Sequence, residues 1–565
     1  MKHFLLALVF LFAPATAGSY ETVTDARLRA PEPSNWLQYR GNYAGWGYSE
    51  LATVHRGNVA NLVPLWSFST GSREAHQAPP LVNGDSMFIT TPANEVLALD
   101  AQRGELRWRY RHEIPEDLFQ LHPTNRGVAL YGDRVFLATV DARIVALDAK
   151  SGKVIFDREV ADYSEGYYMT LAPLAAEGKI MVGVSGGELG VRGFVAAFDA
   201  ATGDLAWKTH TIPLPGEPGG DTWPEGTHAR GGVPAWVTGT YDIETRIAYW
   251  GTGNAGPWMG DQRPGDNLYA NSVLALDVAT GAIRGHHQYH WNGSWDWDEV
   301  SAPILAPFRR GDTEKRGLIH PGRNGYLWFL ERGNGPIGFV DAKPYVTQNV
   351  FSSIDSKTGR PSYHPDRKPG TGKTVTFCPS AWGGKDWPPA AYSPKSRMLY
   401  IPANDNHCSV FTGRPVSEDS PPFYIGMDIG VIELAFPGGE PQSIGELQAW
   451  SVDAAEEVWT HTFKQHNWGP VLATAGDLVF AGGTNDRYFR AFDADSGKVL
   501  WEQRTNSGVV GVPVSYAIDG VQYIAVQSGW GVDAERKQEI LNRMFDPDVH
   551  VPQGGVLWVF GLKTQ

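Results

Sequence analysis

Cysteine is nearly absent from this sequence of 565 residues, which contains only Cys378 and Cys408. With two cysteines so far apart no C-x-x-C-H motif occurs, and this chain therefore carries no covalently attached haem c. In an oxidising compartment an even pair of cysteines predicts one disulfide instead.

Positive charge is also in short supply. The chain has 48 lysine and arginine residues against 62 aspartate and glutamate residues, and its formal net charge is −14. A polyanion such as nucleic acid, or an anionic membrane surface, would be repelled by this balance. The composition therefore argues against those partners; it would suit a basic protein partner, although an acidic surface commonly serves only solubility.

Long hydrophobic runs are missing, with one short exception at the start. Lys2 and His3 precede an apolar run over residues 4–12, and the small residues 15–17 (Ala-Thr-Ala) follow it. The run is too short to span a bilayer, but it has the layout of a secretory signal. We therefore expect residues 1–17 to be a signal peptide and the protein to be periplasmic, without stable membrane insertion.

Glycine, proline and tryptophan are abundant, at 65, 39 and 21 residues, and they accompany an internal repeat. The repeat reads A-[LF]-D-A-x-x-G-x-x-x-aromatic, and its strong copies are residues 98–108, 146–156, 197–207 and 491–501. Weaker copies are residues 275–286 and 449–459. Each copy predicts a strand that ends in Asp, a tight turn with Gly, and a second strand that ends in an aromatic residue.

The spacing of the repeat indicates the fold. The first three copies begin 48 and 51 residues apart, a period that fits the four-stranded blades of an all-β propeller. A β-solenoid and a row of sandwiches are the alternatives. The propeller is favoured because the terminal aromatic residue, usually tryptophan, can dock between adjacent blades. No linker divides the chain, so residues 18–565 are expected to form a single domain.

Several longer segments resemble one family in the correct order. They include residues 35–71, "GGELGVRGFVAAFDAATG", "GTGNAGPW", "RPGDNLY" and residues 473–501. The chain resembles the quinoprotein alcohol dehydrogenases, which bind pyrroloquinoline quinone (PQQ) in an eight-bladed propeller. It is most similar to the soluble methanol and ethanol dehydrogenases that lack a haem domain.

The resemblance implies a set of residues around PQQ. This cofactor is a planar tricarboxylate with an ortho-quinone, so its site needs cations, hydrogen-bond donors and a flat apolar face. The residues that match the family's cofactor contacts are Gln77, Arg126, Thr170, Ser185, Gly186, Gly187, Trp236, Arg323, Asp386 and Trp468. Trp236 matches the indole on which the quinone stacks, and Arg323 would stabilise negative charge on a quinone oxygen.

The resemblance also implies a metal ion. Glu188, Asn254 and Asp296 match the family's ligands, and their oxygens suit a hard cation. Asp296 matches the catalytic base that takes the proton of the substrate hydroxyl. The metal would polarise the quinone as a Lewis acid.

The stretch "WNGSWDWDEV" adds a second carboxylate, Asp298. In an extended chain residues i and i+2 point to the same face, about 6.6 Å apart. Members of the family with an aspartate at this position use a lanthanide, because a trivalent ion favours more negative charge. We therefore expect Asp298 to be a metal ligand and a lanthanide(III) to be favoured over Ca²⁺. The alternative is that Asp298 faces solvent and the metal is Ca²⁺.

Four positions depart from the family pattern. Gln120 and Leu121 stand where many relatives have adjacent cysteines over the quinone, so Leu121 or His122 is expected to cover it instead. Gln77 replaces a frequent glutamate, and Asp386 a frequent asparagine. Cys378 and Cys408 match a structural disulfide.

The expected activity is oxidation of an alcohol to an aldehyde or ketone, with electrons passed to a separate soluble cytochrome c. Two alternatives stay open. One is a related quinoprotein that acts on sugars or polyols, and the other is a non-catalytic propeller that serves as a scaffold in the cell envelope. A scaffold has no reason to keep Glu188, Asn254, Asp296 and Arg323 together, which favours the enzyme. Whether the chain forms a homodimer is left open.

Overall fold

The computed structural model describes residues 20–416, 423–427 and 432–563. The signal peptide expected at residues 1–17 lies outside this part of the chain. The described part is all-β, since its regular secondary structure is almost entirely strand, as the sequence predicts. It contains seven four-stranded sheets and one five-stranded sheet, together with three smaller ones.

The first four of the large sheets follow the chain in order. Their strands are β3 (Leu81–Asn83), β4 (Ser86–Thr90), β5 (Glu95–Asp100) and β6 (Leu106–Arg111); β7 (Val128–Tyr131), β8 (Arg134–Ala138), β9 (Arg143–Asp148) and β10 (Val154–Glu159); β11 (Leu174–Ala176), β12 (Lys179–Gly183), β13 (Phe194–Asp199) and β14 (Leu205–His210); β15 (Thr240–Asp242), β16 (Ile247–Gly251), β17 (Ser272–Asp277) and β18 (Ile283–Gln288).

The other four large sheets continue this order. Their strands are β19 (Ile304–Leu305), β22 (Gly317–Pro321), β23 (Tyr326–Arg332) and β24 (Ile337–Pro344); β28 (Ala391–Ser393), β29 (Met398–Asn404), β32 (Gly445–Ser451) and β33 (Glu456–Phe463); β34 (Leu472–Thr474), β35 (Leu478–Ala481), β36 (Tyr488–Asp493) and β37 (Val499–Arg504), joined by β1 (Tyr48–Ser49); β38 (Val514–Ile518), β39 (Val521–Ser528), β40 (Val556–Leu562) and β2 (Leu62–Ser69).

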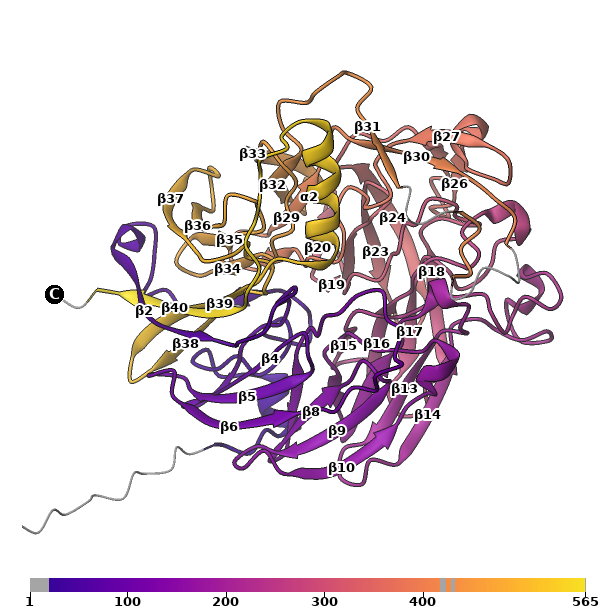
Figure 1. Ribbon diagram of the computed structural model, residues 1–565. Coiled ribbons are helices and arrows are strands. Elements are labelled where there is room, and N and C mark those ends of the chain that lie inside the picture. Colours follow the sequence, from indigo (N-terminus) through magenta and orange to yellow (C-terminus); the bar gives the residue numbers. More distant parts are fainter. Residues whose placement is uncertain (1–19, 417–422, 428–431, 564–565) are drawn as a thin grey trace, which may run out of the picture.

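The sheets succeed one another around the molecule. Figure 1 shows the colours passing from indigo through magenta and orange to yellow in a circuit, until β2 lies beside β40. These two strands, from opposite ends of the chain, pair antiparallel from Leu62 with Leu562 to Ser69 with Val556. The last sheet is therefore completed by an early strand.

The repeat motif explains how neighbouring sheets are held together. As predicted, β5, β9, β13 and β36 each end in the Asp of the motif. The terminal aromatic residue of one copy lies on the glycine of the next: a Cβ atom on Gly152 would fall 2.5 Å from the ring of Trp108, and one on Gly281 would fall 2.5 Å from Trp207. The Trp108 indole also donates to the Ala149 carbonyl oxygen (3.0 Å) in the next sheet. The predicted docking of tryptophan between sheets is confirmed.

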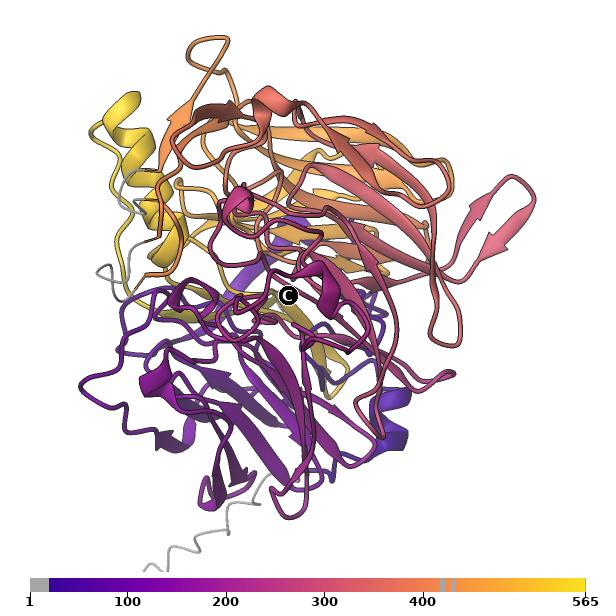
Figure 2. The same cartoon turned by 90° about the vertical axis from the view of Figure 1, so that its right-hand side faces the viewer.

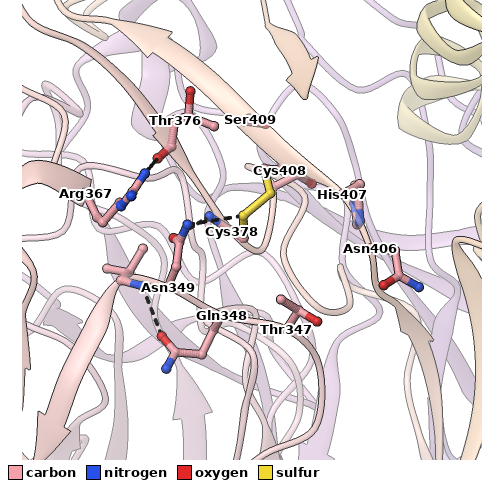
Figure 3. The surroundings of a disulfide bond; sticks show 12 residues. Thr347, Gln348, Asn349, Arg367, Thr376, Cys378, Asn406, His407, Cys408 and Ser409 are labelled. Atoms are coloured by element: carbon pink, nitrogen blue, oxygen red, sulfur yellow. Dashed lines mark hydrogen bonds between the residues drawn. A yellow bond between two sulfur atoms is a disulfide. The ribbon is translucent and has the colours of Figure 1, made fainter. Parts of the chain in front are cut away.

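The smaller sheets lie between the large ones in the chain. Their strands are β20 (Phe308–Arg310) with β21 (Thr313–Lys315), β25 (Phe351–Ile354) with β26 (Pro361–Tyr363), and β27 (Thr374–Phe377) with β30 (Cys408–Thr412) and β31 (Glu433–Ala435). The predicted disulfide joins Cys378, at the end of β27, to Cys408, at the start of β30. Figure 3 shows Asn349 beside it, and this side chain accepts a hydrogen bond from the Cys378 backbone N–H (2.9 Å).

Helices are few among the described residues. The α-helices are α1 (Asp25–Arg29) and α2 (Val532–Met544), and the short 3-10 helices are η1 (Val59–Asn61), η2 (Tyr163–Glu165), η3 (Gly187–Leu189), η4 (Gly220–Thr222), η5 (Gly260–Gln262) and η6 (Pro365–Arg367). Helix α2 was not predicted from the sequence. Figure 2 shows it at one side of the molecule, with α1 on the opposite side. No helix of the described chain is both long and apolar enough to cross a membrane.

The antiparallel order within each sheet gathers the predicted site at one edge. Consecutive strands run in opposite directions, so the start of the first strand and the end of the second lie at the same edge. Every predicted cofactor or metal residue lies on a loop that enters a first strand or leaves a second one: Arg126 precedes β7, Ser185 follows β12 and Arg323 follows β22. Helix α2 follows β39, the second strand of its sheet, and so belongs to the same edge.

Candidate active site

A cavity of about 410 Å³ lies where these loops meet. Ten of the predicted residues line it: Arg126, Thr170, Ser185, Gly186, Glu188, Trp236, Asp296, Asp298, Arg323 and Asp386. These residues lie on loops that enter or leave five different large sheets, and they are spread over 261 positions of the chain from 126 to 386. The structure thus brings together most of the set that the resemblance implied.

Four predicted residues do not line the cavity. Asn254 lies behind it, where its side-chain amide donates to Asp296 (3.1 Å). Gly187 lies beside Glu188 in η3, and a Cβ atom on it would fall 2.9 Å from the ring of Pro234. Gln77 and Trp468 are buried, with relative exposures of 4% and 2%.

The "WDWD" segment divides its side chains between core and cavity. Trp295 and Trp297 are buried and stack on each other, with ring centroids 5.1 Å apart. Asp296 and Asp298 both line the cavity. The segment is not a strand, however, and Asp296 has a φ of 62°, so the expected extended chain was wrong. A buried pair of tryptophans, rather than strand geometry, turns both carboxylates inward.

Asp298 is held by two donors. The Trp236 indole N–H donates to its Oδ2 (2.6 Å), and the Asn254 backbone N–H donates to its Oδ1 (2.5 Å). The side chain is only 6% exposed. The alternative that Asp298 faces solvent is therefore wrong, and the second carboxylate of the motif belongs to the site.

Three acidic side chains line the cavity together: Asp298 is buried, and Glu188 and Asp296 are partly buried. Burial, and then the nearby Asp298, raise the pKa of Glu188 to about 7. Burial also raises the pKa of Asp296 well above its usual range and raises that of Asp298, although Arg323 opposes both shifts. Crowded carboxylates of this kind are stabilised by a cation.

Arg323 is the positive charge nearest these acids. Its guanidinium nitrogens lie 3.6 Å from Asp296, 3.9 Å from Asp298 and 3.4 Å from Asp386. Burial lowers the pKa of Arg323, but these carboxylates outweigh it and hold that pKa above its usual range. Arg323 is therefore charged, and it lies between Asp296, the predicted base, and Asp386, a predicted cofactor residue.

Arg126 is a second arginine in the lining of the cavity. Its guanidinium lies 4.8 Å from the ring centroids of both Trp236 and Trp387, and it donates to the Thr170 hydroxyl (2.5 Å). Burial lowers the pKa of Arg126 to about 10, which leaves it charged at neutral pH. No carboxylate among the described residues forms an ion pair with it. An anionic ligand would supply that missing partner.

Unpartnered polar atoms show that these walls suit a polar ligand. Among the predicted residues, four buried atoms lack a hydrogen-bond partner within the described chain: Arg126 Nε and Ser185 Oγ in the cavity lining, and Gln77 Oε1 and Trp468 Nε1 outside it. A buried polar atom without a partner is costly, so a ligand with carboxylate and carbonyl oxygens would satisfy the donors among them. PQQ fits this requirement, and the three acids with Asn254 fit a hard cation.

Several lining residues were not predicted from the sequence. Tyr168, Pro234, Trp258, Trp382 and Ile432 add apolar or aromatic surface, and Asp533, Arg536, Glu539, Ile540 and Arg543 come from α2. The amphipathic run over residues 532–544 was the available signal for this helix. Leu121 and His122, which were expected to cover the quinone, do line the cavity.

Comparison with known proteins assigns the family. The family model for the β-propeller domain of PQQ-containing glucose, ethanol and alcohol dehydrogenases matches residues 36–360 and 430–524. The chain belongs to the quinoprotein alcohol dehydrogenases. It is therefore an enzyme that uses PQQ and a metal to oxidise alcohols, rather than a scaffold.

Individual relatives cover nearly the whole chain. The quinoprotein alcohol dehydrogenase PedH of Pseudomonas putida is 34% identical over all of this chain and 97% of its own length. A lanthanide-dependent methanol dehydrogenase of Methylacidiphilum fumariolicum is 34% identical over 88% of this chain and 85% of its own. Among solved structures, a europium-containing methanol dehydrogenase superposes with a TM-score of 0.89 at 32% identity, over 95% of this chain and 100% of its own.

Proposed function

We propose that this enzyme oxidises an alcohol in the periplasm, using PQQ with a lanthanide(III) ion, and passes its electrons to a separate soluble cytochrome c. The observation that carries the proposal is the group of Glu188, Asp296 and Asp298, which line the cavity with Arg323. The N-terminal sequence supports export, and the lack of a C-x-x-C-H motif supports an external electron acceptor. The homodimer stays a prediction.

The eight large sheets are proposed to be eight blades that close into a ring. The pairing of β2 with β40 supports this closure, because it joins both ends of the chain within one sheet. The same pairing supports a single domain over residues 18–565. A ring of this kind brings the loops of distant sheets to one cavity.

The residues at the cavity walls would hold the cofactor. Arg126, Thr170 and Ser185 offer a cation and two hydroxyls to carboxylate or quinone oxygens, and Trp236 offers a flat indole face. Gln77 and Trp468 present unpartnered polar atoms beside them. When bound, PQQ and its metal supply the acceptor for the hydride that leaves the alcohol carbon.

Asp296 would move the proton. Its raised pKa makes the carboxylate a stronger base than an ordinary aspartate, and Asn254 fixes its Oδ1 by a hydrogen bond of 3.1 Å. The Asp296 carboxylate would accept the proton of the substrate hydroxyl, while Arg323 beside it stabilises the negative charge that develops in the site. Apolar lining from Leu121, Trp258 and Trp382 would exclude water.

The choice of a trivalent ion follows from charge. Glu188, Asp296 and Asp298 together carry three negative charges when ionised, which a lanthanide(III) neutralises and Ca²⁺ does not. The lanthanide-dependent and europium-containing methanol dehydrogenases among the similar proteins support this choice. Asp298 keeps free lone pairs for a metal, because its two donors use only one on each oxygen.

The proposal is tested by reconstituting metal-free protein with PQQ and La³⁺. We expect primary or secondary alcohols to reduce a soluble cytochrome c in its presence, with sugars and polyols as the comparison panel. Oxidation of sugars alone would contradict the alcohol as substrate. Reduction of an artificial dye but of no cytochrome c would contradict the proposed acceptor.

A further inference from the structure

Helix α2 is anchored on the rest of the fold by a face of buried side chains. Val532, Ala534 and Leu541 pack into an apolar cluster with Trp382, Trp468 and Trp530. The buried Lys537 ammonium donates to His407 Nε2 (2.9 Å). The position of α2 is therefore fixed by one face of the helix, which leaves its other residues free to act on the cavity.

One turn of α2 reaches across to the loop before Arg126. Arg536 Nη2 donates to the Leu121 carbonyl oxygen (2.6 Å), and Arg536 Nη1 donates to Asp533 Oδ1 (3.2 Å). Asp533 Oδ2 lies 3.1 Å from His122 Nε2. The chain of polar contacts ends at the buried Tyr168, whose hydroxyl lies 3.4 Å from His122 Nδ1.

The charge of Asp533 suits this role. Burial raises the pKa of a carboxyl, but His122, Arg536 and Arg323 outweigh it and hold the pKa of Asp533 below its usual range. Asp533 also lies in the first turn of α2, where the helix dipole favours a negative charge. It is therefore ionised at neutral pH and bridges His122 and Arg536.

The loop has little structure of its own. Residues 112–124 form no strand between β6 and β7. Within the described chain, the one hydrogen bond to a backbone atom of Gln120 or Leu121 is the bond that Arg536 donates. Side chains of α2 therefore decide where this part of the loop lies.

Leu121 and His122 line the same cavity as Arg126 and Trp236. We propose that Asp533 and Arg536 are positioning residues, which hold Leu121 and His122 as the cover of the cofactor cavity. Gln120 and Leu121 are not cysteines and cannot form a disulfide, so the contacts from α2 hold this part of the loop instead. The cover then retains the cofactor and forms the wall nearest the substrate.

The proposal rests on the proposed function, and its test measures the release of PQQ. Tryptophan fluorescence reports bound PQQ through Trp236, Trp258 and Trp382 at the cavity. We expect Asp533→Ala and Arg536→Ala to release PQQ at least tenfold faster than the wild type. Glu535→Gln is the matched control, since Glu535 lies on the same helix but bonds Gln553 (2.7 Å) away from the cavity.

Two further measurements separate positioning from general damage. The double variant Asp533→Ala/Arg536→Ala should release PQQ more slowly than the product of the two single effects predicts, because these two side chains bond each other and hold the same loop. Hydrogen exchange over residues 117–124 should rise in the Asp533 and Arg536 variants without any cofactor, and should not rise in Glu535→Gln. Additive effects in the double variant would overturn the proposal.

The outcomes distinguish a failure of the proposed function from a failure of the positioning role of α2. If the wild type binds no PQQ, the proposed function fails. If it binds PQQ and the folded variants release it at the wild-type rate, with unchanged exchange over residues 117–124, the positioning role of α2 fails.

Discussion

At the scale of single residues, the site depends on how a few carboxylates are turned inward. Asp296 and Asp298 reach the cavity because Trp295 and Trp297 are buried behind them. Asp298 is fixed by the Trp236 indole and the Asn254 backbone, and Asp296 by the Asn254 side chain. Asn254 thus orders both acids of the motif, although it does not line the cavity itself.

Replacement of Asp296 by Asn removes the proposed base while keeping its size. The kcat for an alcohol should fall by about 10²-fold or more, since general-base catalysis commonly contributes that much. The measurement is steady-state dye reduction by protein loaded with PQQ and metal. Asp366→Asn, an exposed carboxylate beside Arg367, is the control and should keep full activity. A fall of less than threefold in Asp296→Asn, with PQQ bound, would rule out this role.

At the scale of elements, α2 carries a buried positive charge. Lys537 has no exposed surface and meets the neutral His407, whose Nδ1 faces the Asp405 carbonyl oxygen. Burial lowers the pKa of Lys537 to about 7. An unfolded lysine has a pKa near 10.4, so folding at neutral pH bears a cost of about 5 kcal/mol at this residue.

The pH dependence of that cost gives a prediction for Lys537→Met. Below pH 7, Lys537 is protonated in both the folded and the unfolded wild type, and the cost is fully present. Between pH 7 and about 10, Lys537 keeps its proton only in the unfolded state, so the stability of the wild type rises with pH. The Tm advantage of Lys537→Met should therefore be largest near pH 6.5 and shrink toward pH 9.5. Burial also lowers the pKa of Lys385, but this residue is present in both proteins, so its effect cancels in the difference in Tm. A difference in Tm that does not change with pH would contradict the buried charge, and the exposed Lys498→Met serves as control.

At the scale of the whole molecule, stability comes from repeated contacts between neighbouring sheets. Trp108 lies on Gly152 and donates to Ala149, so it joins the sheet of β3–β6 to that of β7–β10. Trp501 donates in the same way to Leu62 (2.9 Å), which joins the sheet of β34–β37 to the last one.

Trp108→Ala removes both the ring and its hydrogen bond. The free energy of unfolding should fall by about 2–4 kcal/mol, less than for a fully buried tryptophan because Trp108 is half-buried. Urea unfolding followed by circular dichroism measures this change. Val154, half-exposed at the start of β10, provides the control: Val154→Ala should lower the free energy of unfolding by less than about 0.5 kcal/mol. Equal effects of the two changes would show that the docked ring contributes nothing of its own.

Much of this architecture can be predicted from the sequence, because the repeat records it locally. Each copy contains a strand, its turn and the aromatic residue that meets the next copy. In one copy Asp148 ends the strand, Gly152 forms the turn and Phe156 packs on the glycine of the following copy. The resemblance to the family likewise indicated ten residues that line the cavity. The left-handed backbone of Asp296 could not be predicted, because it follows from the packing of two tryptophans. Leu121 or His122 was expected from the sequence as the cover, but the contact that holds the cover was not, because Arg536 and Leu121 lie 415 positions apart.

The most direct test of the account is a metal titration of PQQ-loaded protein, with La³⁺ or Ca²⁺ and a primary alcohol as substrate, in the wild type and in Asp298→Asn. We expect the wild type to oxidise the alcohol with La³⁺, and Ca²⁺ at the same concentration to support an activity at least tenfold lower. Asp298→Asn should lose more of the La³⁺-dependent activity than of the Ca²⁺-dependent activity, because one of three negative charges is gone. Full activity with Ca²⁺ alone, unchanged in Asp298→Asn, would contradict the three-carboxylate site for a trivalent ion.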